Sequence, residues 1–203
     1  MPEFPSLTTM KYEDIRTSLI SGDVILCSGN YTFSKLIQKA TGSCWSHVAF
    51  ILKLDVVDRV MVLESIEHHG VRTVPLSEYV TNFEGTGKGY GGRMAVLRHS
   101  AVDSGIIPPE DFKVMAQFAV DRFGYPYDEE EIARITTRIV GSHLGMSKAE
   151  LVRNNEFICS EYVYECYKRL GLDIAYDKRG FVAPADFAKD PKMRMMWEIE
   201  VKQ

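Results

Sequence analysis

Residues 45–66, WSHVAFILKLDVVDRVMVLESI, contain two strand patterns separated by a partly polar connection. The first pattern is WSHVAFIL at 45–52, the second is RVMVLESI at 59–66, and both are rich in β-branched and aromatic residues. KLDVVD at 53–58 joins them, and so short a connection favours an antiparallel hairpin. We therefore expect two neighbouring strands of an antiparallel sheet.

Two polar residues of this hairpin, His47 and Glu64, are candidates for a functional pair. The midpoint of their numbers falls between Asp55 and Val56, so a symmetric hairpin would place them directly opposite each other on one face. An imidazole that donates to a carboxylate has its tautomer fixed, which leaves the other nitrogen free to take a proton from a thiol. Two alternatives stay open. A one-residue bulge would send Glu64 to the opposite face, and a histidine at a strand end can simply hydrogen-bond a neighbouring acid.

The segments around the hairpin predict more of a sheet. GDVILCSG indicates a strand starting at Asp23, and TFSKLIQKATG indicates a short helix that ends at Gly42. A further strand pair is expected in VRTVPL at 71–76 and RMAVLRH at 93–99, separated by the glycine-rich EGTGKGYGG at 84–92. The first half of the chain is therefore expected to be rich in β-structure.

The second half of the chain has helical patterns. PPEDFKVMAQFAVDRFG at 108–124 carries apolar residues at helical spacing behind a proline and acidic start, and DEEEIARITTRIV at 128–140 predicts another helix. NNEFICSEYVYECYKRLGL at 154–172 has apolar residues on one helix face from Cys159 onward, with Gly171 at the expected left-handed C-terminus. The expected class is α+β.

Cys159 occupies the first turn of the last of these helices. At that position the unpaired backbone N–H groups and the positive end of the helix dipole favour a thiolate. A small buried apolar residue is the alternative reading of a lone cysteine. Cys166, further along the same face, is expected to be a core residue.

Length and composition narrow the class of protein. The 203 residues, 45% of them hydrophobic, suffice for one sizeable core, and we expect a single domain over residues 1–203. A net charge of -4 gives no basic field for nucleic acid. Because residues 1–15 lack the pattern of a signal peptide and no stretch has about 18 uninterrupted apolar residues, we expect a cytoplasmic chain without a transmembrane segment. Its four cysteines are then expected to be reduced.

The ordered set of motifs resembles a known family. SGDVIL at 21–26, SHVAFIL at 46–52, LES at 63–65 and FICSEYV at 157–163 are together similar to the permuted papain-like cysteine hydrolases of the NlpC/P60 superfamily, specifically the YiiX/YaeF-like group. The histidine strand precedes the cysteine helix, which is the permuted order. The resemblance implies a circularly permuted papain-like fold with an antiparallel sheet packed on helices.

The same resemblance implies roles for three residues: Cys159 as nucleophile, His47 as base and Glu64 as the residue that orients the base. It implies a thiol-dependent hydrolase, an amidase or peptidase, that acts on an amide or acyl substrate through a Cys159 thioester and needs no cofactor. The substrate would be a small peptide, an amino-acid amide or an acyl-lipid. The alternatives are a lipid acyltransferase and a module that binds acylated peptide or lipid without turnover.

Metal and phosphate sites are not expected. Cys44 and His47 have a C-x-x-H spacing that His68 and His69 could extend, but no second close ligand pair gives the usual structural-zinc pattern. EGTGKGYGG superficially resembles a phosphate loop, but Lys88 is followed by glycine instead of Ser or Thr.

Four remaining features have ordinary structural explanations. GYGG at 89–92 and FGYPYD at 123–128 are candidates to line a cleft, although a turn and a helix connection explain them equally well. The acidic run Asp128–Glu131 suits a helix start. His99 and His143 have no candidate partner in the sequence, so we expect solvated or hydrogen-bonded histidines.

Overall fold

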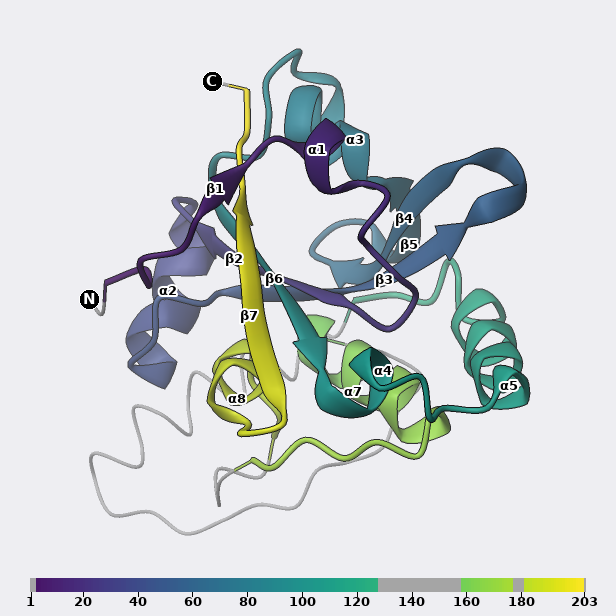
Figure 1. Ribbon diagram of the computed structural model, residues 1–203. Helices are drawn as coiled ribbons and strands as arrows, with labels where there is room; N and C mark the ends of the chain where they lie inside the picture. Colours follow the sequence, from purple (N-terminus) through teal and green to yellow (C-terminus); the bar gives the residue numbers. More distant parts are fainter. Residues whose placement is uncertain (1–2, 128–157, 177–180, 203) are drawn as a thin grey trace, which may run out of the picture.

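The computed structural model describes residues 3–127, 158–176 and 181–202, and its centre is a seven-stranded sheet with the order β1-β7-β6-β2-β3-β4-β5 (Figure 1). Neighbouring strands are antiparallel except β1 and β7, which are parallel. The strands are β1 (Thr9–Met10), β2 (Val24–Gly29), β3 (His47–Leu54), β4 (Arg59–Ile66), β5 (Gly70–Pro75), β6 (Gly92–His99) and β7 (Met193–Ile199). The predicted antiparallel sheet and α+β class are confirmed.

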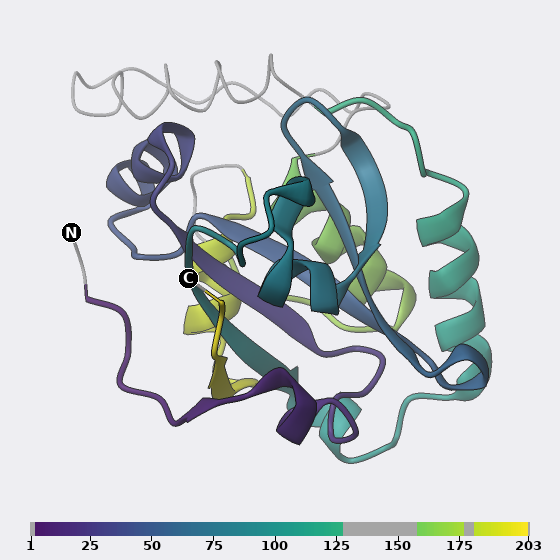
Figure 2. The same cartoon turned by 90° about the horizontal axis from the view of Figure 1, so that it is seen from above.

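Helices cover both faces of the sheet, with α5, α7 and α8 on one face and α1 and α3 on the other (Figure 2). The helices are α1 (Tyr12–Ile15), α2 (Thr32–Thr41), α3 (Leu76–Thr81), α4 (Ser100–Asp103), α5 (Pro109–Val120), α7 (Cys159–Arg169) and α8 (Pro184–Lys189), with 3-10 turns η1 (Asp55–Val57) and η2 (Phe83–Gly85). None of the helices in the described ranges combines the length and the apolar character needed to cross a membrane.

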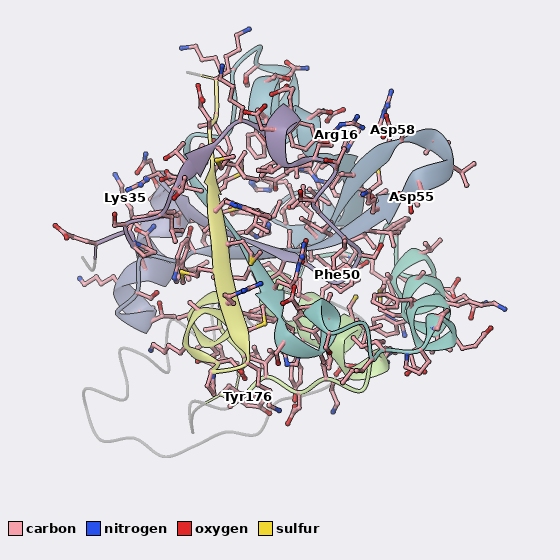
Figure 3. The ribbon with its side chains drawn as sticks, in the orientation of Figure 1. Arg16, Lys35, Phe50, Asp55, Asp58 and Tyr176 are labelled. Carbon is pink, nitrogen blue, oxygen red and sulfur yellow. The ribbon has the colours of Figure 1, made fainter. Side chains whose placement is uncertain are left out.

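Two apolar cores follow from this layering, because successive residues of a strand point to opposite faces. In β3, Phe50 belongs to the core under α7, whereas Ile51 belongs to the core under α3. Phe50 lies near the middle of the molecule (Figure 3), and its ring packs against Tyr167 of α7 with centroids 6.0 Å apart. The central strands are therefore buried on both faces, which explains their nearly continuous apolar sequence.

The register of the β3–β4 hairpin differs from the symmetric one. Phe50 pairs with Leu63, so continuing the ladder places Glu64 level with Ala49, and the prediction that it lies directly opposite His47 is wrong. The reason is the connection, in which η1 is followed by a left-handed Asp58 (φ 49°). A shift of two residues preserves the face on which a side chain points, so His47 and Glu64 keep the predicted common face.

The predicted pairing of segments 71–76 and 93–99 is also wrong. β5 pairs with β4, and β6 lies between β2 and β7. The reason is local: the tight turn between β4 and β5 has left-handed backbone at His68 (φ 66°) and Gly70 (φ 67°), so these two strands form a hairpin directly. Helix α3 separates β5 from β6 instead.

The remaining sequence predictions concern the helices and the chain ends. Gly42 (φ 61°) and Gly171 (φ 68°) adopt the predicted left-handed conformation after α2 and α7. The sequence did not reveal β7, which returns to the sheet after the helices and breaks the expected division into two halves. The helix predicted at 128–140 lies outside the described residues, and the single domain over 1–203 stays a prediction.

Candidate active site

His47 and Glu64 are hydrogen-bonded to each other. Nε2 of His47, the first residue of β3, lies 2.8 Å from Oε2 of Glu64 near the end of β4. The Glu64 side chain is fully buried and the His47 side chain is 13% exposed. Although the two residues are not directly opposite, their common face lets the side chains meet. The predicted contact between His47 and Glu64 is therefore present, although the predicted strand register is wrong.

The start of β3 is held by polar contacts. Ser46 Oγ accepts a hydrogen bond from the Gly29 N–H at 3.1 Å. The buried Gln38 of α2 donates from Nε2 to the carbonyls of Gly29 (3.1 Å) and Cys44 (2.9 Å). Because buried hydrogen bonds of this kind are costly to break, they fix the backbone from which the His47 side chain projects.

Cys159 is the first residue of α7, as the sequence predicted for the helix start. Ile158 before it has extended backbone (φ -78°, ψ 160°), which begins the helix at Cys159. The first N–H groups of a helix have no partner within it and point toward its N-terminal end. The neighbouring Ser160 donates from Oγ to the Val182 carbonyl at 2.7 Å, which attaches this end of α7 to the segment before α8.

Cys159 also acts on His47. Burial alone would lower the pKa of His47, but interactions with the Cys159 and Glu64 side chains raise the pKa of His47 to about 10. An imidazolium beside the Glu64 carboxylate is therefore stable at neutral pH. Since Nε2 faces Glu64, Nδ1 is the nitrogen left for the sulfur.

Two residues missed by the sequence analysis hold Glu64. Arg72 of β5 donates from Nε to Glu64 Oε1 at 2.9 Å, and the buried Tyr79 hydroxyl of α3 donates to Oε2. Burial would raise the pKa of Glu64, but the contacts with His47, Arg72 and Tyr79 lower it below its usual range. The carboxylate is therefore charged and fully engaged, as a buried anion requires.

Sequence signals for these two residues differ. Arg72 is the register partner of Glu64 across β4 and β5, so pairing those two strands would have identified it. Tyr79 reaches Glu64 only through the packing of α3 against the sheet, and no sequence pattern points to it.

The thiols of the other three cysteines are less acidic than an ordinary cysteine thiol. Burial is the largest cause in each case, and it raises the pKa of Cys27, Cys44 and Cys166 above the usual value. The negative charge of the Glu64 carboxylate raises the pKa of Cys27 further. Protonated thiols are poor nucleophiles, so these three residues are expected to react slowly.

Other residues noted in the sequence take no part in this network. Within the described ranges, no group of three or more His, Cys, Asp or Glu side chains could hold a metal ion, and His68 is an exposed turn residue. His99 Nδ1 accepts a hydrogen bond from the Ala101 N–H at 3.1 Å, which begins α4. His143 and Asp128–Glu131 lie outside the described residues.

A pocket opens beside Cys159, between α2 and the segment Phe181–Pro184. Tyr127 of the FGYPYD segment lines it. Among the described lining residues, none comes from GYGG at 89–92. One of the two proposed cleft segments therefore contributes to the pocket.

An α+β fold in which a histidine strand precedes a cysteine helix defines a permuted papain-like protein. Residues 18–202 match the family described as "Permuted papain-like amidase enzyme, YaeF/YiiX, C92 family", and the chain belongs to this family. The crystal structure described as that of the metalloprotein yiiX from Escherichia coli O157:H7 has a similar fold, with a TM-score of 0.58 and 19% identity over 91% of this chain and 97% of that chain. No curated protein matches the chain. The predicted YiiX/YaeF-like group and permuted papain-like fold are confirmed, and the family is described as one of amidases.

Proposed function

We propose that this protein is a thiol-dependent hydrolase that cleaves an amide or acyl bond of a small substrate through a thioester on Cys159. One observation carries the proposal: the His47 imidazole lies between Cys159, at the N-terminus of α7, and the fully buried Glu64 carboxylate, 2.8 Å from its Nε2. Nucleophile, base and orienting group are thus arranged as in other catalytic triads. The description of the family as amidases supports the same class of enzyme. We further propose that the family belongs to the NlpC/P60 superfamily.

In the first half of the reaction, the Cys159 thiolate attacks the substrate carbonyl carbon and a C–S bond forms. The carbonyl π electrons move to oxygen, and the backbone N–H of Cys159 donates to this oxyanion. When the carbonyl re-forms, the bond to the leaving amine or alcohol breaks and the leaving group takes the proton from the His47 imidazolium. The products are a thioester, the free leaving group and a neutral imidazole.

Water completes the cycle. His47 removes a proton from a water molecule, whose oxygen attacks the thioester carbonyl. The C–S bond then breaks and its electron pair returns to sulfur, which restores the thiolate and the imidazolium. Throughout, Glu64 keeps Nε2 of His47 protonated and stabilises the positive charge whenever it forms.

The two alternative functions make different demands on the site. A lipid acyltransferase would use the same thioester and replace water by an alcohol or amine acceptor. A module that only binds acyl groups has no need of a positioned imidazolium. Because three ionisable side chains, those of His47, Glu64 and Arg72, are costly to bury, their retention together favours catalysis.

The test combines labelling with acyl transfer. Limited iodoacetamide treatment at neutral pH, analysed by peptide mass spectrometry, should modify Cys159 before the other three cysteines. Incubation with an activated acetyl ester should add one acetyl group to the wild-type protein, seen by intact mass, and none to Cys159→Ala. Preferential labelling of another cysteine would refute the assignment. Absence of both an acyl adduct on a reactive Cys159 and release of the leaving group from the ester would favour the binding module.

A further inference from the structure

Helix α2 (Thr32–Thr41), which lies beside one end of the sheet in Figure 1, directs two polar residues inward. Ser34 and Gln38 are the buried residues of this helix, and Gln38 hydrogen-bonds two backbone carbonyls. An amphipathic helix ordinarily packs its apolar side against the core. Here the apolar residues at helical spacing line the pocket beside Cys159 instead: Phe33, Leu36, Ile37 and Ala40.

The opposite wall of this pocket is apolar as well. Ile158, Phe181 and Ala183 are buried and form a small hydrophobic cluster of their own, against which Tyr127 packs. All four residues line the pocket, as does Cys159. The pocket therefore places the nucleophile within an apolar surface.

No charged side chain is found among the described lining residues of the pocket. The cationic residues of α2, Lys35 and Lys39, instead line a second hollow, which has Phe33 and Leu36 in common with the pocket (Lys35 is labelled in Figure 3). A charged or strongly polar substrate group placed in the pocket would lose its hydration without gaining an ionic partner among the described lining residues.

From this geometry we infer that the pocket holds the acyl part of the substrate and selects an apolar acyl group. The chemistry fits a fatty acyl chain or the side chain of a large apolar amino acid. The inference rests on the proposed thioester, because the carbon chain of an acyl group bonded to Cys159 must occupy the space next to that residue. Each methylene that enters the pocket should speed acylation about fourfold until the pocket is filled.

Alkylation measures this preference without turnover. The rate at which Cys159 reacts with N-butyl and N-hexyl iodoacetamide is compared with its rate with iodoacetamide. We expect the rate to rise with alkyl length by about tenfold or more in total. Selective labelling by iodoacetamide with no alkyl preference would overturn the pocket assignment alone. Failure of iodoacetamide to label Cys159 would overturn the proposed function, and the pocket assignment with it.

Variants of the lining residues test whether this pocket causes the preference for longer alkyl groups. Ala40→Phe narrows the pocket, and Leu36→Asn, at a side chain already 40% exposed, makes its rim polar with little risk to folding. Both should lower the ratio of the hexyl rate to the iodoacetamide rate by about fivefold or more. Leu54→Asn is the matched control, because Leu54 is 37% exposed and lies at the other end of β3 from His47. An equal effect of Leu54→Asn would contradict the assignment.

Amides of one fluorescent amine distinguish the two sources of apolar acyl group. Fastest cleavage of the octanoyl amide would support the inference and identify a fatty acyl substrate. Fastest cleavage of the phenylalanyl amide would support it and identify an apolar amino acid. Fastest cleavage of the lysyl or acetyl amide would overturn it.

Discussion

Glu64→Gln is the sharpest test of the proposed site. The substitution keeps the size of the side chain and removes its negative charge. In the wild-type protein this carboxylate accepts from His47 Nε2 at 2.8 Å, from Arg72 Nε at 2.9 Å and from the Tyr79 hydroxyl. An amide has only one oxygen, so at least one of these three donors would lose its acceptor.

The expected loss of stability is large. Removal of one member of a buried ion pair typically costs about 3–5 kcal/mol, because the remaining charge stays desolvated. Since the Arg72 side chain is 19% exposed and water partly compensates it, we expect about 3 kcal/mol for Glu64→Gln. The reactivity of Cys159 should fall too. A charge-assisted hydrogen bond contributes about 1.5–3 kcal/mol, which corresponds to a labelling rate about 10- to 100-fold lower.

The pH dependence of the stability difference has a definite sign. The pKa of Glu64 is lowered below the usual 4.5 in the folded protein, so its contribution to stability is fully present above pH 4.5 and is lost as the pH falls through the folded pKa. The difference in unfolding free energy between wild type and Glu64→Gln should therefore be largest between about pH 4.5 and pH 6.5 and should shrink as the pH falls below that range.

The assay is urea unfolding at several pH values, together with the rate of Cys159 labelling. Glu67→Gln is the matched control, since Glu67 is exposed and its contact with His68 is long, at 3.8 Å. It should change the unfolding free energy by less than about 0.5 kcal/mol and leave labelling unchanged. If Glu64→Gln matched this control in both measurements, Glu64 would not orient His47.

Three further predictions concern the cysteines and His47. Cys166→Ala should lower the unfolding free energy by about 1 kcal/mol in urea titrations and leave Cys159 labelling unchanged, since Cys166 is a core residue. Chelation with EDTA should not alter the labelling rate, whereas faster labelling with release of stoichiometric zinc would identify a metal thiolate. The pKa of His47 is raised from 6.5 to about 10, so its contribution is fully present below pH 6.5 and is lost as the pH rises through 10. The stability difference between wild type and His47→Ala should accordingly shrink over that range, and a difference independent of pH would contradict the ion pair.

The sequence predicted the parts of the site that depend on local structure. His47 and Glu64 lie on one face because side chains alternate along strands, and this parity survives a register shift of two residues. Cys159 lies at a helix start because the apolar spacing of α7 begins there. These features follow from residues close in sequence, so the sequence alone predicts them.

The missed parts depend on contacts between distant segments. Tyr79 reaches Glu64 from α3 on the far side of the sheet, and β7 enters the sheet beside β6 after the helices. The pairing of β7 with β6 also has a register irregularity between Val96 and Leu97 of β6, and the sequence of β7, MRMMWEI, lacks the regular alternation that predicts a strand. Neither feature has a local pattern from which it could be derived.

The relative position of Cys159 and His47 is also set by distant contacts. The buried Tyr162 donates from its hydroxyl to the Ala119 carbonyl of α5 at 3.0 Å, and the buried Tyr167 donates to the Gly22 carbonyl, just before β2, at 2.9 Å. Together they fix α7 along its axis. A slip of one helical turn would move Cys159 by about 5.4 Å, which is more than a hydrogen bond to His47 tolerates.

The site therefore depends on how α7 packs against the sheet and α5. A histidine strand placed before the cysteine helix can meet it as well as one placed after it. This gives a physical reason why the permuted order is compatible with a papain-like site: side chains such as Tyr162 and Tyr167 hold α7 in place through contacts in space.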